Sequence, residues 1–306
     1  MNTNLRDKMF ENNRKNLVGT VITQFFSALV ITYSAVFLQK IMDLGLNGTT
    51  NDIITMAIAT VLYIILAVVI EFLKRHFKNC FYEKAIRQLK EEMFHKITQK
   101  NISTFQKEST AEYISEFTND INSIQDHYLF NLIDRILWGV LSFTFALITM
   151  LHYNVLLTLI ALVVMILSFI PTLLTGKDIP MMEERVSNEN SKFTMLVKDL
   201  LGGFPIIKNF RMEDRAGRLF DEANARLEKT KCERRKKHDL IGIVGGSTGF
   251  AVQATIFLLG TAFVLAGKIT SGTVMAFIQL IAQVLGAIQT LPPALADHKA
   301  GLHLID

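Results

Sequence analysis

The stretch that decides the fold is ILWGVLSFTFALITMLHYNVLLTLIALVVMILSFIPTLLTG, residues 136–176, which contains no Asp, Glu, Lys or Arg. A helix that crosses the hydrocarbon core of a bilayer needs about 20 mostly apolar residues. The stretch is about twice that length, and the LHYN sequence at residues 151–154 interrupts it near its middle. We therefore interpret it as two membrane-spanning helices joined by a very short turn.

Four further charge-free stretches lie outside this one, and each is about long enough for one crossing. Hydrophobic residues make up 50% of the 306 residues and charged residues 20%. Because the charge-free stretches take up so much of the chain, the charged residues are concentrated in the segments between them. A soluble helix shows an apolar stripe opposite a charged face, and these segments have no charged face. We predict an all-α membrane protein with six transmembrane helices, at about residues 17–39, 53–73, 131–151, 154–176, 241–266 and 271–291.

Lysine and arginine are distributed unevenly between the loops. They are frequent in the N-terminal segment 1–16 and in the two long connections, residues 74–107 and 177–237, whereas the three short loops together contain two lysines and no arginine. Loops rich in Lys and Arg stay on the cytoplasmic side. We therefore expect a multi-pass cell-membrane protein with both termini cytoplasmic, with GKITSG at 267–272 as an outer hairpin. The net charge of +4 follows from this topology, and we expect no nucleic-acid partner.

The two long connections have a helical pattern. Apolar residues recur on one face after the second span, which is predicted to continue to about Lys100 and to project about 40 Å beyond the bilayer at 1.5 Å per residue. NISTFQKEST at 101–110 interrupts the pattern, and Ser109 with Glu112 is a capping-box signature for a returning helix. The two stripes are Phe77, Phe81, Leu89, Met93 and Ile97, then Tyr113, Phe117, Ile121, Ile124 and Tyr128.

The connection between the fourth and fifth spans repeats this plan. An apolar stripe runs from Met182 to Leu200, LGGFP at 201–205 interrupts it, and a second stripe includes Leu219 and Leu227. The basic run KCERRKKH that follows is interpreted as anchoring near anionic lipid headgroups rather than as a specific lipid or nucleic-acid site. Each connection is therefore predicted to be an arm of two antiparallel helices that meet at a short distal element.

This organisation carries motifs that resemble the membrane domain of ATP-binding cassette (ABC) exporters, over nearly the whole chain. FQKESTAEYISEFTNDINSIQDHY at 105–128 and LLGGFPIIKNFRMEDRAGRLF at 200–220 are similar to the family's first and second intracellular-loop motifs. GKITSGTVMAFIQL at 267–280 resembles its hairpin between spans five and six. We expect an atypical contact at the first coupling element, because the chain departs from the family's usual residues at Gln106, Ala111 and Glu116.

The resemblance implies a mechanism for residues 17–306. Two such membrane domains would pair, as a homodimer or a heterodimer, and short coupling helices at the arm tips would contact nucleotide-binding domains that hold ATP and Mg. By position these helices are expected at about 103–109 and 209–216. The residues expected in the coupling elements are Ser103, Thr104, Phe105, Gln106, Phe210, Arg211, Met212, Glu213 and Asp214.

No catalytic motif accompanies these features. The sequence contains no G-x-x-x-x-G-K-[ST] phosphate-binding loop, so the resemblance implies that ATP hydrolysis comes from a domain C-terminal to this chain or from a partner chain. Of the two we expect the first, with the chain a fragment. We expect no cofactor or metal on the chain itself, because none of its seven His residues has a metal-binding spacing. The sequence therefore leaves open whether the chain is part of an ATP-hydrolysing enzyme.

Polar side chains within the predicted spans are costly in a bilayer and therefore informative. The candidates for lining a substrate path are Gln24, Tyr33, Gln253, Gln279, Gln283 and Gln289. Interhelical hydrogen bonds that hold the bundle together explain them equally well. A small molecule, a peptide or a lipid suits the apolar spans, and membrane lipid is a further expected partner.

The predicted function is the membrane-spanning half of an ATP-driven exporter, which forms the substrate pathway and couples to an ATPase domain through two intracellular loops. One alternative is a transport-inactive receptor or regulatory subunit with the same fold. The other is a secondary transporter, which would be expected to carry ionisable residues at mid-membrane. The centres of the six predicted spans contain none.

Overall fold

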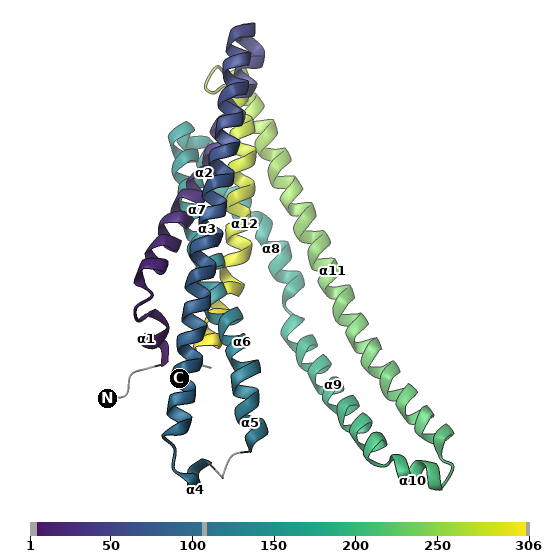
Figure 1. Ribbon diagram of the computed structural model, residues 1–306. Coiled ribbons are helices and arrows are strands. Elements are labelled where there is room, and N and C mark those ends of the chain that lie inside the picture. The colour runs from purple at the N-terminus through teal and green to yellow at the C-terminus, as the bar shows by residue number, and fades with distance from the viewer. Residues whose placement is uncertain (1–4, 106–108, 304–306) are drawn as a thin grey trace. The chain divides into compact units, whose positions relative to one another are not determined.

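The computed structural model describes residues 5–105 and 109–303, which form helices joined by short turns, with no strand in this part of the chain (Figure 1). Helices η1 and η2 have π-helical hydrogen bonding, and the others are α-helices. In chain order the elements are α1 (Leu5–Phe10), α2 (Arg14–Asn47), α3 (Thr50–Thr98), α4 (Ile102–Phe105), α5 (Thr110–Ser115), η1 (Glu116–Asp120), α6 (Ile121–Ile124), η2 (Gln125–Leu137), α7 (Trp138–Tyr153), α8 (Val155–Gly176), α9 (Ile179–Gly202), α10 (Phe204–Asn209), α11 (Glu213–Leu265) and α12 (Ser271–His303).

Six helical runs in the described residues are long and apolar enough to cross a membrane, which confirms the predicted all-α, multi-pass organisation. The stretch 136–176 is divided as expected, because α7 ends at Tyr153 and α8 begins at Val155. Asn154 separates them and caps α8, since its Oδ1 accepts a hydrogen bond of 2.9 Å from the backbone N–H of Leu157. The third span differs in one respect: its predicted start at residue 131 lies inside the π-helical segment η2.

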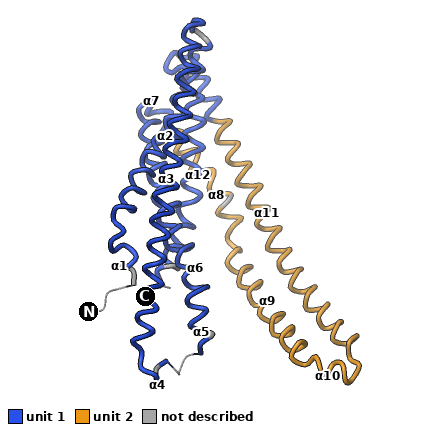
Figure 2. The backbone as a smooth tube through the Cα atoms, in the orientation of Figure 1, with its two compact units in different colours: residues 1–159, 256–306 blue, residues 160–255 orange. Residues whose placement is uncertain are grey.

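The chain forms two compact units, residues 1–159 with 256–306 and residues 160–255 (Figure 2). In the first unit, α12 packs against α2, α7 and η2, and α2 packs along α3. The most enclosed part of α12 contains Phe277, Leu280, Ile281 and Val284, none of which has exposed surface. Helix α12 is therefore central to the first unit.

A second cluster in this unit contains residues from both apolar stripes predicted for the first arm. Phe81 and Leu89 of α3 pack with Ile121 of α6 and with Tyr128 of η2, and Met9 from the N-terminal helix α1 is buried among them. Helix α3 continues to Thr98, close to its predicted end. The antiparallel helices predicted for the first arm are therefore confirmed.

In the second unit, ion pairs connect the basic run before the fifth span with helix α9. Arg234 lies 2.9 Å from Glu183 of α9, and Lys237 lies 3.1 Å from Asp178, the residue directly before α9. The ring of His238 lies 3.5 Å from Glu183, a contact that is an ion pair only when the histidine is protonated. Part of this run therefore joins α11 to α9, a role that the interpretation as a headgroup anchor did not include.

Candidate functional site

The tip of the first arm is the four-residue helix α4, which contains Ser103, Thr104 and Phe105. The ring of Phe105 is 39% exposed and stacks on Tyr113 of α5, with centroids 4.9 Å apart and planes 6° apart. The ammonium of Lys100 lies 4.9 Å from the centroid of the same tyrosine ring. Phe105 is thus held by the returning helix while part of its ring stays accessible. Gln106, the fourth predicted residue of this element, lies outside the described residues.

The tip of the second arm lies earlier in the sequence than expected. The short helix is α10, Phe204–Asn209, whereas the predicted interval 209–216 contains the turn and the first residues of α11. The reason is local: Gly203 follows the end of α9, and Pro205 occupies the first turn of α10, where proline is favoured because that turn needs no N–H donor. Arg211 has φ +50°, which reverses the chain before α11.

This tip presents apolar and charged groups together. Phe210 is 72% exposed, and Lys208 forms an ion pair of 3.0 Å with Glu213 across the turn. Through this hydrogen bond the Lys208 ammonium holds the pKa of Glu213, which lies outside the membrane-spanning part of α11, below its usual value. Glu213 and Asp214 lie in the first turn of α11, where negative charge is favourable. Arg211 and Met212 complete the exposed turn.

Sequence reasoning missed part of this surface, because it placed the short helix too late. Leu201, Phe204 and Ile206 are more than half exposed, and they precede Phe210 at the end of α9 and in the short helix α10. The signal that points to them is LGGFP itself, since a glycine pair followed by proline ends one helix and begins the next.

Within the spans, Gln283 of α12 connects three helices of the first unit. Its Nε2 lies 2.8 Å from Thr32 Oγ1 of α2, 2.8 Å from Ser142 Oγ of α7 and 3.1 Å from the Ser142 carbonyl oxygen. Gln24 of α2 is 2% exposed, and its Nε2 donates to the carbonyl of Ile133 in η2 at 3.1 Å. For these two glutamines the structure supports interhelical hydrogen bonding.

The other four candidates have different surroundings. Gln279 and Gln289 are exposed on α12, and Tyr33 is exposed and packs beside Phe37 and Tyr63. Gln253 is partly buried and belongs to the second unit. No hydrogen bond joins any two of the six candidates in the described part of the chain, so a substrate path through them stays a prediction.

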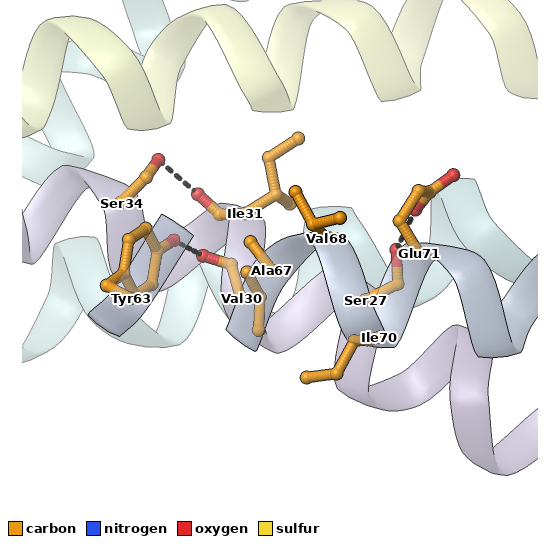
Figure 3. A pocket seen from close by; sticks show the side chains of 9 residues that line it. All are labelled: Ser27, Val30, Ile31, Ser34, Tyr63, Ala67, Val68, Ile70 and Glu71. Atoms are coloured by element: carbon orange, nitrogen blue, oxygen red, sulfur yellow. Dashed lines mark hydrogen bonds between the residues drawn. The ribbon is translucent and has the colours of Figure 1, made fainter. Parts of the chain in front are cut away.

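A pocket of about 360 Å³ lies between α2 and α3 (Figure 3). Its polar groups already have partners in the protein: the Tyr63 hydroxyl donates to the Val30 carbonyl, and the Ser27 hydroxyl donates to Glu71 at 3.3 Å. Lys74 lies 2.6 Å from the same carboxylate. The pocket therefore presents mainly apolar walls, with one partly neutralised carboxylate. Elsewhere in the described residues, no group of three or more His, Cys, Asp or Glu is arranged to hold a metal ion.

Comparison with known proteins agrees with this architecture. Among curated relatives, the putative multidrug export ATP-binding/permease protein YgaD of Bacillus subtilis (strain 168) is 24% identical over 247 residues, covering 80% of this chain and 42% of the relative. The fatty acid ABC transporter ATP-binding/permease protein of Mycobacterium bovis is 26% identical over 233 residues, 75% of this chain and 36% of the relative. The ATP-dependent lipid A-core flippase of Syntrophus aciditrophicus (strain SB) is 23% identical over 200 residues, 64% and 32% respectively.

The chain thus spans less than half the length of each of these relatives. The family model of the ABC transporter transmembrane region matches residues 17–288, which contain all six membrane-spanning runs in whole or in large part. The six apolar helical runs and this match over most of the sequence lead to one assignment: the chain belongs to the ABC transporter transmembrane region family.

Proposed function

We propose that this chain is the membrane-spanning half of an ATP-driven exporter, and that its two arm tips transmit the movements of an ATP-binding domain to the spans. The observation that carries the proposal is the second tip, where exposed apolar side chains and an ion-paired turn lie at the end of an uninterrupted helix. The names of the relatives support it, because each joins export, transport or flipping to ATP.

The length of the helices explains how a tip can act at a distance. Helix α11 has 53 residues, which corresponds to about 80 Å at 1.5 Å per residue. Helix α3 has 49 residues and likewise runs from an arm into a membrane-spanning segment. A displacement of either tip would therefore be carried into the bilayer by one continuous helix. ATP would shift the balance between two conformations because the ATP-binding domain binds it differently in each.

We further infer the orientation and the partners. The excess of Lys and Arg in the arms and in the N-terminal segment favours a cytoplasmic location for both arms and both termini in the cell membrane. The partners would be a second transmembrane domain, identical or different, and a nucleotide-binding domain that holds ATP and Mg. The apolar spans and the names of the relatives favour an amphipathic small molecule or lipid as the substrate.

The proposal is tested by reconstituting the chain with an ATP-binding domain in vesicles and measuring ATP hydrolysis beside ATP-dependent uptake of a fluorescent lipid. Phe210→Ala is expected to lower the amount transported per ATP hydrolysed at least tenfold, because it removes the most exposed ring of the second tip. Phe72→Ala is the matched control, since Phe72 is also an exposed phenylalanine, 73%, but lies near the middle of α3, far from both arm tips. An ATP-binding domain that associates without any ATP-dependent transport would instead indicate a receptor or regulatory subunit.

A further inference from the structure

Helix η2, Gln125–Leu137, is a π-helix of 13 residues between the first arm and α7. The π-helix closes i→i+5 hydrogen bonds, and in most proteins it occurs as a single turn. A second π-helical segment, η1, lies only four residues before it. Because such a long π-helical run is uncommon, contacts with other helices must stabilise it in addition to the preferences of its own sequence.

Three side chains from three different helices reach the backbone carbonyls of η2. Gln24 of α2 donates to the Ile133 oxygen at 3.1 Å. The Tyr82 hydroxyl of α3 lies 3.4 Å from the Leu129 oxygen, and its single proton is shared between this carbonyl and the closer carboxylate of Asp134 in η2, at 3.1 Å. His298 of α12 has its Nδ1 3.3 Å from the Tyr128 oxygen, and because a carbonyl only accepts, this nitrogen carries the proton. The donors therefore contact carbonyls along η2 itself rather than its side chains alone.

Further contacts join the same helices to η2. Asp134 accepts hydrogen bonds from Lys78 at 3.1 Å and from the Tyr82 hydroxyl at 3.1 Å. The ring of His298 stacks on Tyr128, with centroids 4.8 Å apart and planes 16° apart. Segment η2 is thus held from α3 and α12 through side chains as well as through its backbone.

Two buried carboxamide oxygens at η2 have no hydrogen-bond partner among the described residues: Oε1 of Gln24 and Oδ1 of Asn131. The two residues are 2% and 1% exposed. A buried acceptor without a partner costs free energy, and such groups can store strain. Both oxygens lie at the same π-helical segment, so the hydrogen bonding around η2 is incomplete in this form.

We propose that η2 has two registers, and that it changes between π and α hydrogen bonding when the first arm moves. Gln24, Tyr82 and His298 are positioning residues that hold the π register. The change from i→i+5 to i→i+4 bonds would rotate and lengthen the connection, so a displacement of α5 and η1 would become a rotation of α7. The movement of the first arm as the trigger rests on the proposed function. The stabilisation of the π register of η2 by Gln24, Tyr82 and His298 does not.

The test uses this chain alone in lipid nanodiscs. Cys80 and Cys232 are first replaced by Ser. Spin labels are then placed at two exposed residues: Asp126, the second residue of η2, and Val140, in the first turn of α7. A π-helix is shorter than an α-helix of the same residues, because it winds more residues into each turn. The wild-type chain is expected to give one distance between the labels, and Gln24→Leu and Tyr82→Phe are expected to add a second, longer population.

Tyr63→Phe is the matched control, because the Tyr63 hydroxyl also donates to a helix carbonyl, that of Val30, but outside η2. His298→Phe keeps a ring against Tyr128 and removes only the donor. Amide hydrogen exchange across residues 125–137 is expected to rise at least tenfold in the three η2 variants, and to stay unchanged in the control. Exchange across residues 271–290 provides an internal reference for overall stability.

A single unchanged distance in all variants would overturn the inference, as would a rise in exchange that is equal at 125–137 and 271–290. Neither measurement needs an ATP-binding domain, so failure of the proposed function would leave a positive result standing. Conversely, ATP-driven transport without a second population in Gln24→Leu would refute only the two registers of η2.

Discussion

Asp43 of α2 accepts a hydrogen bond of 2.9 Å from the backbone N–H of Gly272, at the start of α12. The other oxygen of its carboxylate accepts one of 2.9 Å from the Thr270 hydroxyl, which in turn accepts from the N–H of Thr273 at 3.2 Å. The first N–H groups of a helix have no partner within that helix. A carboxylate from one span therefore caps another span that is 229 residues away in the sequence.

Gly272 permits this contact because it has no side chain. A Cβ atom at this position would lie 2.2 Å from the carbonyl oxygen of Gln39 and 2.6 Å from Oδ1 of Asp43. Gly272→Ala is expected to lower the free energy of unfolding by about 1–3 kcal/mol, since overpacking forces the backbones apart. Thermal unfolding in detergent measures the effect. Gly286→Ala on the same helix is the control: its Cβ would meet no atom within 4 Å, so that variant should unfold no earlier than the wild type.

The carboxylate itself can be tested separately. Asp43→Ala is expected to cost about 0.5–2 kcal/mol, the range observed when a helix cap is removed. Chemical denaturation monitored by circular dichroism measures the loss. Asp221→Ala removes an exposed aspartate from α11 and serves as the control. Equal stability of the two variants would contradict the role of Asp43 as a cap.

The hairpin at residues 267–272 shows which parts of the fold the sequence predicts. GKITSG between two apolar runs was enough to predict the turn, because both boundaries are local, and Gly267 there has φ +69°. The cap from Asp43 could not be predicted, because its donor and acceptor lie in distant segments. The same holds for the π-helical form of η2: its hydrogen-bonding partners Gln24 and His298 come from helices far apart in the chain.

The second arm tip shows a different limit. Gly203 and Pro205 indicated where α9 ends, but the motif resemblance placed the short helix at 209–216. Local chain chemistry was the better guide, since proline in the first turn begins a new helix directly after the break. The arms themselves were predictable because their apolar stripes have the helical period.

The ion pair at this tip predicts a dependence on pH. Because Lys208 lowers the pKa of Glu213 in the folded chain, the pair stabilises the turn at pH values above the ordinary pKa of a glutamate. That stabilisation is lost as the pH falls through the lowered pKa. After correction for the intrinsic exchange rate at each pH, the protection of the amides across residues 204–213 is therefore expected to fall on acidification. Lys208→Met should raise exchange at neutral pH and remove most of this dependence; an unchanged pH profile in the variant would show that Lys208 is not its source.

Gln283 offers the most direct choice between a structural role and a role in the substrate path. Its contacts with Thr32 and Ser142 predict that Gln283→Leu lowers stability by about 0.6–1.7 kcal/mol, from the average to the largest value measured for interhelical hydrogen bonds in a membrane protein. Gln289→Leu, which changes an exposed residue on the same helix, should leave the unfolding midpoint unchanged. The same two variants are then assayed for ATP-dependent uptake.

If the substrate path instead runs along α12, Gln289→Leu is expected to change the half-saturating substrate concentration of transport severalfold without any loss of stability. If Gln283→Leu unfolds at the wild-type midpoint and yet alters transport, its hydrogen bonds are not what hold the three helices together. The physical reason is that leucine fills the same volume but leaves the Thr32 and Ser142 oxygens without their shared donor. A bundle held by that donor must therefore lose stability when it is removed.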